Sequence, residues 1–102
     1  MKIGFAGVPK SIDNDIPFVD STFGFETCCE EAGKFITSGY LEATGIIDGI
    51  GLIKVMGRHS GYIAMMAALC NSQCDFCIIP ENPWELAGPN GLIAQVYERM
   101  QE

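Results

Sequence analysis

Residues 50–70 read IGLIKVMGRHSGYIAMMAALC, which is an apolar run, a short polar turn and a second apolar run. The first run, Ile50 to Met56, has the length of a strand, and continuous apolar strands are typical of parallel sheets that are buried on both faces. The second run, Ser60 to Cys70, has the length of a helix. The stretch therefore predicts a strand–turn–helix unit, from which α/β folds are built.

Similar units precede and follow this stretch. Lys2 to Val8 is a short apolar segment that ends before Pro9, and a helical pattern follows from Thr22 to Thr44. Asp75 to Ile79 predicts a third strand, and the amphipathic segment Gly91 to Gln101 predicts a last helix. The order predicts an α/β fold, a parallel sheet with flanking helices joined by right-handed crossovers.

The helix predicted over 22–44 has a marked apolar stripe and identifiable ends. Ser21 or Thr22 fits its N-cap, and Gly45 fits its end. Its apolar side chains recur at the spacing of one helix face: Phe25, Cys28, Ala32, Phe35, Ile36 and Tyr40. Three strands are fewer than the roughly five or six of a typical sheet, so we expect the chain to be a piece of a larger enzyme.

Composition excludes several classes of protein. The 102 residues carry a formal net charge of -7 and are 48% hydrophobic, which argues against disorder and against a nucleic-acid binder. The longest nearly apolar stretch, Gly61 to Cys70, is about half of a membrane span, so no membrane partner is expected. Five cysteines, an odd number, favour reduced thiols in an intracellular protein.

Polar clusters follow each predicted strand: residues 10–15, residues 56–58, and Pro80 with Glu81. Ligands of open α/β sheets bind beyond the carboxyl ends of the strands. The carboxylates, hydroxyl and cations of these loops suit a phosphorylated substrate that carries hydroxyl groups. The alternative is that Asp13 and Asp15 only make turn hydrogen bonds, and that Arg58 pairs with a nearby acid.

The three clusters together resemble the phosphofructokinase family. GVPKSIDNDI at 7–16 is similar to that family's G-x-P-x-T-I-D-N-D-I loop, VMGRHSG at 55–61 to its V-M-G-R-x-S-G segment, and IPE at 79–81 to its Ile/Val-Pro-Glu segment. The resemblance runs over essentially the whole chain. Lys10 and the stretch STFGF at 21–25 resemble most closely the plant and protozoan ATP-dependent subgroup.

The resemblance implies a two-lobed kinase that transfers a phosphoryl group from ATP to the 1-hydroxyl of fructose 6-phosphate, giving fructose 1,6-bisphosphate in glycolysis. Residues 1–22 would end the nucleotide-binding lobe with the catalytic loop, and residues 23–102 would form part of the sugar-phosphate lobe. The implied catalytic residues are Asp13 as the base, Asp15 and Arg58. The implied substrate-binding residues are Ser11, Ile12, Asp13, Met56, Gly57, Arg58 and Glu81, with Lys10 at the donor phosphate.

The resemblance also sets expectations beyond these residues. It implies Mg²⁺ bound with ATP, but the family's G-G-D motif is absent, so no metal ligand is expected in this chain and no turnover from the chain alone. A homo-oligomer, a dimer or tetramer, is implied for the full-length protein. Gly49 stands where bacterial members carry a phosphate-binding arginine. The cytoplasm is the expected location, with a plastid as the alternative.

Other interpretations remain open. One is a pyrophosphate-dependent fructose 6-phosphate 1-phosphotransferase, and another is a non-catalytic paralogue that binds sugar phosphates. His59 is interpreted as a structural or rim residue. Cys70, Cys74 and Cys77 have the C-x3-C-x2-C spacing of radical S-adenosylmethionine enzymes. A [4Fe–4S] cluster is disfavoured because Cys70 is expected to end a helix and Cys77 to lie within a strand.

Overall fold

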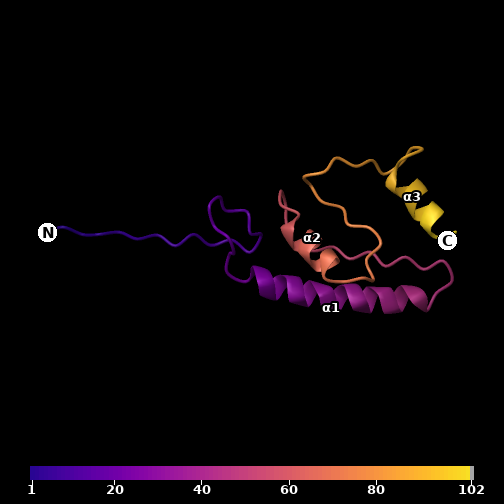
Figure 1. Ribbon diagram of the computed structural model, residues 1–102, viewed down its shortest axis with the longest axis horizontal. Helices are drawn as coiled ribbons and strands as arrows, with labels where there is room; N and C mark the ends of the chain where they lie inside the picture. The colour runs from indigo at the N-terminus through magenta and orange to yellow at the C-terminus, as the bar shows by residue number, and fades with distance from the viewer. Residues whose placement is uncertain (102) are drawn as a thin grey trace.

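The computed structural model describes residues 1–101 and arranges them in an elongated shape of 71 × 28 × 15 Å (Figure 1). The described residues form three helices, α1 (Phe25–Thr44), α2 (Tyr62–Leu69) and α3 (Leu92–Arg99). Each lies inside a range that the sequence predicted as helical, so these predictions are confirmed. None of the helices in the described range combines the length and apolar character needed to cross a lipid bilayer.

The predicted parallel sheet does not form within residues 1–101. Segments 2–8, 50–56 and 75–79 contain no strand, and the first runs outward as an extended tail (Figure 1). Phe5 and Leu52 on these segments are 93% and 86% exposed. A strand completes its backbone hydrogen bonds only with a neighbouring strand, and these three segments do not pair with one another. Residues 1–101 by themselves thus lack the strand partners that the apolar pattern requires.

The N-terminus of α1 differs from the prediction. Gly24 is the N-cap and makes no side-chain hydrogen bond, so the prediction of Ser21 or Thr22 as the cap was wrong. The Thr22 carbonyl instead accepts a hydrogen bond from the N–H of Phe25 at 3.3 Å, and its hydroxyl is buried without a partner in the described residues. Gly45 ends the helix as predicted.

The core lies between α1 and α2, the one pair of helices in contact in the described part of the chain. Phe25 and Ala32 of α1 and Ile63 and Ala67 of α2 are its buried apolar residues. Just after α2, the Asn71 amide donates hydrogen bonds to the Gly33 carbonyl at 3.1 Å and to Thr37 Oγ1 at 3.2 Å, both on α1. These contacts fix α2 on α1.

The segment after α1 returns along the helix. A Cβ at Gly39 would lie 2.7 Å from Ile53 Cδ1, so the returning segment passes close to the helix at this glycine. The return carries residues 56–61 back toward the loop that precedes α1 (Figure 1). The start of α2 therefore lies near residues 11–24, although more than thirty residues separate them along the chain.

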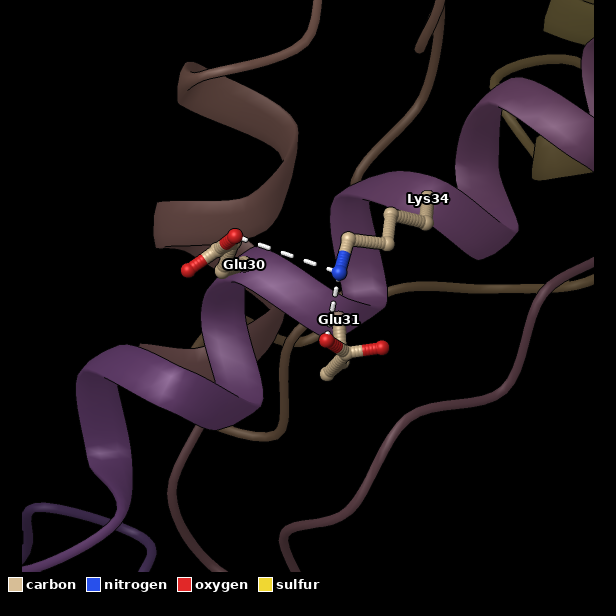
Figure 2. Close-up of polar contacts among 3 residues, drawn as sticks. All are labelled: Glu30, Glu31 and Lys34. Carbon is tan, nitrogen blue, oxygen red and sulfur yellow. Dashed lines mark hydrogen bonds and ion pairs between the residues drawn. The ribbon is translucent and has the colours of Figure 1, made fainter.

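The outer face of α1 carries a small ion cluster. Figure 2 shows the Lys34 ammonium donating a hydrogen bond to Glu31 and lying 3.9 Å from a Glu30 carboxylate oxygen. These pairs are one helical turn apart, the spacing at which side chains on a helix meet. All three side chains are largely exposed, so the cluster belongs to the surface of α1 and not to its packing.

Candidate functional site

The loop before α1 is organised by the hydroxyl of Ser11. Ser11 Oγ donates a hydrogen bond to Asp15 Oδ1 at 2.7 Å and accepts one from the N–H of Asp13 at 3.2 Å. A serine hydroxyl that bonds the backbone two residues later is a common turn device. Ser11 thus fixes the backbone at Asp13 and engages the carboxylate of Asp15.

Asn14 closes the same loop onto the approach to α1. Its φ is 54°, a left-handed conformation that asparagine adopts more readily than most residues. Its Oδ1 accepts a hydrogen bond from the N–H of Thr22 at 2.9 Å, and its Nδ2 donates to the Asp20 carbonyl at 3.4 Å. Asn14 is not among the site residues predicted from the sequence, although an asparagine in a polar loop before a helix is a signal for such local bonds.

The turn before α2 is tight. Gly57 has a φ of 123°, and a Cβ there would collide with the carbonyl oxygen of Ser60. Arg58 and His59 are the exposed residues between them. Within residues 1–101 no carboxylate lies within ion-pair distance of the Arg58 guanidinium, so the predicted alternative of a pairing acid is not observed there.

Three loops meet at the start of α2. Ser60 Oγ donates a hydrogen bond to the Asp13 carbonyl at 3.0 Å, and the N–H of Gly61 donates to Glu81 Oε1 at 2.7 Å. Since Ser60 and Gly61 are neighbours, residues 11–15, 57–61 and 79–81 converge, and we call them the three-loop junction. Gly61 is buried, and a Cβ on it would lie 2.5 Å from Ile79 Cβ, so the contact is close-packed.

The predicted site residues fall into two groups. Those placed in the three-loop junction are Ser11, Asp13, Asp15, Gly57, Arg58 and Glu81. Ile12 lies in the same loop, but its Cδ1 is directed at Gly24, 3.6 Å from where a Cβ of Gly24 would stand. Lys10 and Met56 precede two of the junction loops and are exposed, Met56 by 54%. The junction thus gathers most of the predicted residues.

The two aspartates of the loop have different surroundings. The carboxylate of Asp15 accepts the hydrogen bond from Ser11, whereas no donor among residues 1–101 reaches the carboxylate of Asp13. Asp13 is half-buried, and both of its backbone groups are hydrogen-bonded. Because the main chain of Asp13 is fixed and no group donates a hydrogen bond to its carboxylate, that carboxylate is suited to accept a proton from a ligand.

The described residues contain no side-chain cluster that could hold a metal ion by itself. No group of three or more His, Cys, Asp or Glu side chains in residues 1–101 could hold one. Mg²⁺ that is bound with a nucleotide takes one or two carboxylates and fills its octahedron with waters and phosphates, so a cluster of three side chains is not required for it.

The cysteines are free thiols and do not gather into a cluster site within the described range. Partial burial raises the pKa of the Cys77 thiol, and the charge of Cys74 raises it further. Burial likewise raises the pKa of Cys29, with smaller contributions from Cys28, Cys70 and Glu26. Cys70 ends α2 as expected, whereas Cys77 does not lie in a strand, because residues 75–79 form none.

Comparison with known proteins gives a consistent result. The family model described as Phosphofructokinase matches residues 1–102. The chain is 49% identical over 102 residues to ATP-dependent 6-phosphofructokinase 1 of Arabidopsis thaliana, covering 100% of this chain and 22% of the relative. It is 54% identical over 93 residues to the chloroplastic ATP-dependent 6-phosphofructokinase 5 of the same plant, covering 91% of this chain and 17% of the relative.

A bacterial relative matches over the same range. The ATP-dependent 6-phosphofructokinase of Borreliella burgdorferi is 44% identical over 102 residues, covering 100% of this chain and 23% of the relative. The chain thus spans about a fifth of the length of the curated relatives that it matches.

Proposed function

Because the chain belongs to the phosphofructokinase family, we propose that it is part of a longer ATP-dependent 6-phosphofructokinase. That enzyme would transfer the γ-phosphoryl group of ATP to the 1-hydroxyl of fructose 6-phosphate, a step of glycolysis. The names of the relatives support ATP as the donor. In the longer protein the apolar segments 2–8, 50–56 and 75–79 would join further strands in a parallel sheet, and the lobes would divide near residue 22.

The observation that carries the proposal is the state of Asp13, which is anchored at the three-loop junction with a carboxylate that accepts no hydrogen bond within residues 1–101. As the base, this carboxylate would take the proton of the sugar 1-hydroxyl. The hydroxyl oxygen would form a bond to the γ-phosphorus while the bond from phosphorus to ADP breaks. Positioning and charge stabilisation supply most of the rate of such a transfer.

The neighbouring residues would bind and orient the reactants. Arg58 is exposed and lies two residues before Ser60, which bonds the Asp13 carbonyl. Its planar guanidinium would bind a phosphoryl oxygen. Asp15, already engaged by Ser11, would orient the loop, and Ser11, Ile12, Met56 and Gly57 would line the sugar site. Glu81 uses Oε1 to hold Gly61, so Oε2 would be the oxygen that accepts a sugar hydroxyl.

The donor side of the reaction would be completed elsewhere in the longer protein. Lys10 would neutralise part of the donor phosphate charge. Mg²⁺, bound with ATP, would neutralise the remainder, and its protein ligands would come from outside the described residues. We propose a homo-oligomer, a dimer or tetramer, in the cytoplasm, with a plastid as the alternative because two relatives are named chloroplastic.

The test is a coupled assay of ATP-dependent fructose 6-phosphate phosphorylation by the longer protein. Asp13→Asn keeps the shape and removes the base, so kcat should fall by at least about 10²-fold. The matched control is Asp48→Asn, in an exposed turn with a φ of 55° that asparagine also adopts, and it should leave kcat unchanged. An Asp13→Asn variant that keeps more than a tenth of the wild-type kcat would contradict the assignment.

The same assay separates the two alternatives. Activity with pyrophosphate but not with ATP would identify the pyrophosphate-dependent enzyme. A protein that binds fructose 6-phosphate in calorimetry but turns over with neither donor would be the non-catalytic paralogue. The unengaged carboxylate of Asp13 and the unpaired Arg58 of the described chain favour the enzyme.

A further inference from the structure

Ser60 forms the one hydrogen bond that joins residues 11–15 to residues 57–61 in the described chain. Its Oγ donates to the Asp13 carbonyl at 3.0 Å across 47 residues of sequence. The Ser60 side chain is only 6% exposed, which makes it one of the few buried polar residues. Breaking this partly buried hydrogen bond is costly because the Asp13 carbonyl loses its partner.

Ser60 is itself held on both sides. Its carbonyl oxygen packs against Gly57, and the next residue, Gly61, donates its N–H to Glu81. The N–H of Tyr62, the first residue of α2, points to Ser60 Oγ at 3.5 Å. The hydroxyl thus stands between helix α2 and the loop, with its lone pair toward the helix and its proton toward Asp13.

The position of the Asp13 carboxylate depends on its backbone, since no donor in residues 1–101 holds the carboxylate directly. Two hydroxyls fix that backbone, Ser11 at the N–H and Ser60 at the carbonyl. We infer that Ser60 is a positioning residue for Asp13, an inference that rests on the proposed function. Small displacements of a reacting group reduce rates strongly, so Ser60 would act on kcat through Asp13.

The first test is Ser60→Ala in the longer protein. We expect kcat to fall about tenfold while KM for fructose 6-phosphate stays within twofold, because a loosened base affects the transition state more than ground-state binding. Ser60→Thr keeps the hydroxyl and should retain at least a third of the wild-type kcat. Ser38→Ala is the matched control, because Ser38 Oγ also donates to a backbone carbonyl, that of Lys34 at 3.1 Å, on the exposed side of α1.

A double-mutant cycle with Asp13→Asn separates positioning from a merely structural role. If Ser60 acts through Asp13, then Ser60→Ala should lower the residual kcat of Asp13→Asn by less than twofold. A further tenfold loss in that background, an unchanged kcat in Ser60→Ala, or an effect confined to KM would overturn the inference. Should Ser60→Ala not fold, Ser60→Cys replaces the hydroxyl by a weak donor and must show the same loss of kcat for the inference to stand.

The outcomes also separate this inference from the proposed function. If Asp13→Asn is harmless, the assignment of the base fails and the inference fails with it. If Asp13→Asn inactivates the enzyme and Ser60→Ala does not reduce kcat, the proposed function stands and the positioning role alone is overturned.

Discussion

The three-loop junction and the apolar segments 2–8, 50–56 and 75–79 differ in how their backbone N–H and C=O groups are hydrogen-bonded. At the junction, side chains of the same chain supply the hydrogen bonds, from Ser11, Asn14, Ser60 and Glu81. Segments 2–8 and 50–56 receive no side-chain hydrogen bond within residues 1–101, segment 75–79 receives one from Cys74 Sγ to the Phe76 carbonyl at 3.3 Å, and none of the three contains a strand. The helices and the junction loops therefore find their hydrogen-bond partners within residues 1–101, whereas a parallel sheet forms only when its neighbouring strands are present.

The largest expected effect concerns the apolar segments. In the 102-residue chain alone, backbone amides of residues 50–56 should exchange with solvent at the rates of an unstructured peptide. In the longer protein, strand pairing should slow the same amides by at least about 10³-fold. Hydrogen exchange read by mass spectrometry measures both, and the isolated chain should show no phosphoryl transfer. Comparable exchange in the two proteins would contradict the proposed sheet.

A smaller effect, on the free energy of unfolding, is expected when a methyl group is added at the three-loop junction. In Gly61→Ala the new methyl group would lie 2.5 Å from Ile79 Cβ and 2.6 Å from Glu81 Oε2, so we expect the free energy of unfolding to fall by about 1–3 kcal/mol. Gly33→Ala on α1 is the control, since a Cβ at Gly33 would meet nothing within 4 Å. This substitution should stabilise the helix by about 0.5–1 kcal/mol. Denaturant unfolding of the longer protein measures both, and equal effects would show that the junction is not close-packed.

The smallest effect belongs to the surface of α1. The hydrogen bond from Lys34 to Glu31, the charge of Glu31 and then that of Glu30 raise the pKa of Lys34. A raised folded-state pKa means that the ion cluster stabilises the protein below about pH 10 and that this contribution is lost as pH rises through the folded pKa. Lys34→Gln should therefore be slightly less stable than wild type at pH 7 and equal to it near pH 12, because exposed ion pairs contribute little.

Much of the helical structure could be predicted from the sequence, because the apolar spacing of helices is local. The loops that contain Asp13, Arg58 and Glu81 were expected to meet at the edge of a sheet; residues 11–15, 57–61 and 79–81 do meet, but through side-chain hydrogen bonds, because the expected strands are absent from residues 1–101. The bond between Ser60 and Asp13 could not be predicted, because no local pattern links residues 47 apart. The N-cap of α1 is Gly24 and not Thr22, because the Thr22 hydroxyl is buried and makes no hydrogen bond to the start of the helix.

The exposed apolar segments have a practical consequence for anyone who expresses this chain alone. Rows of unpaired N–H and C=O groups flanked by residues such as Phe5 and Leu52 are templates on which identical copies can stack. Purified at high concentration, the chain should form intermolecular cross-β deposits unless charged flanking residues or a fused solubility tag keep the copies apart.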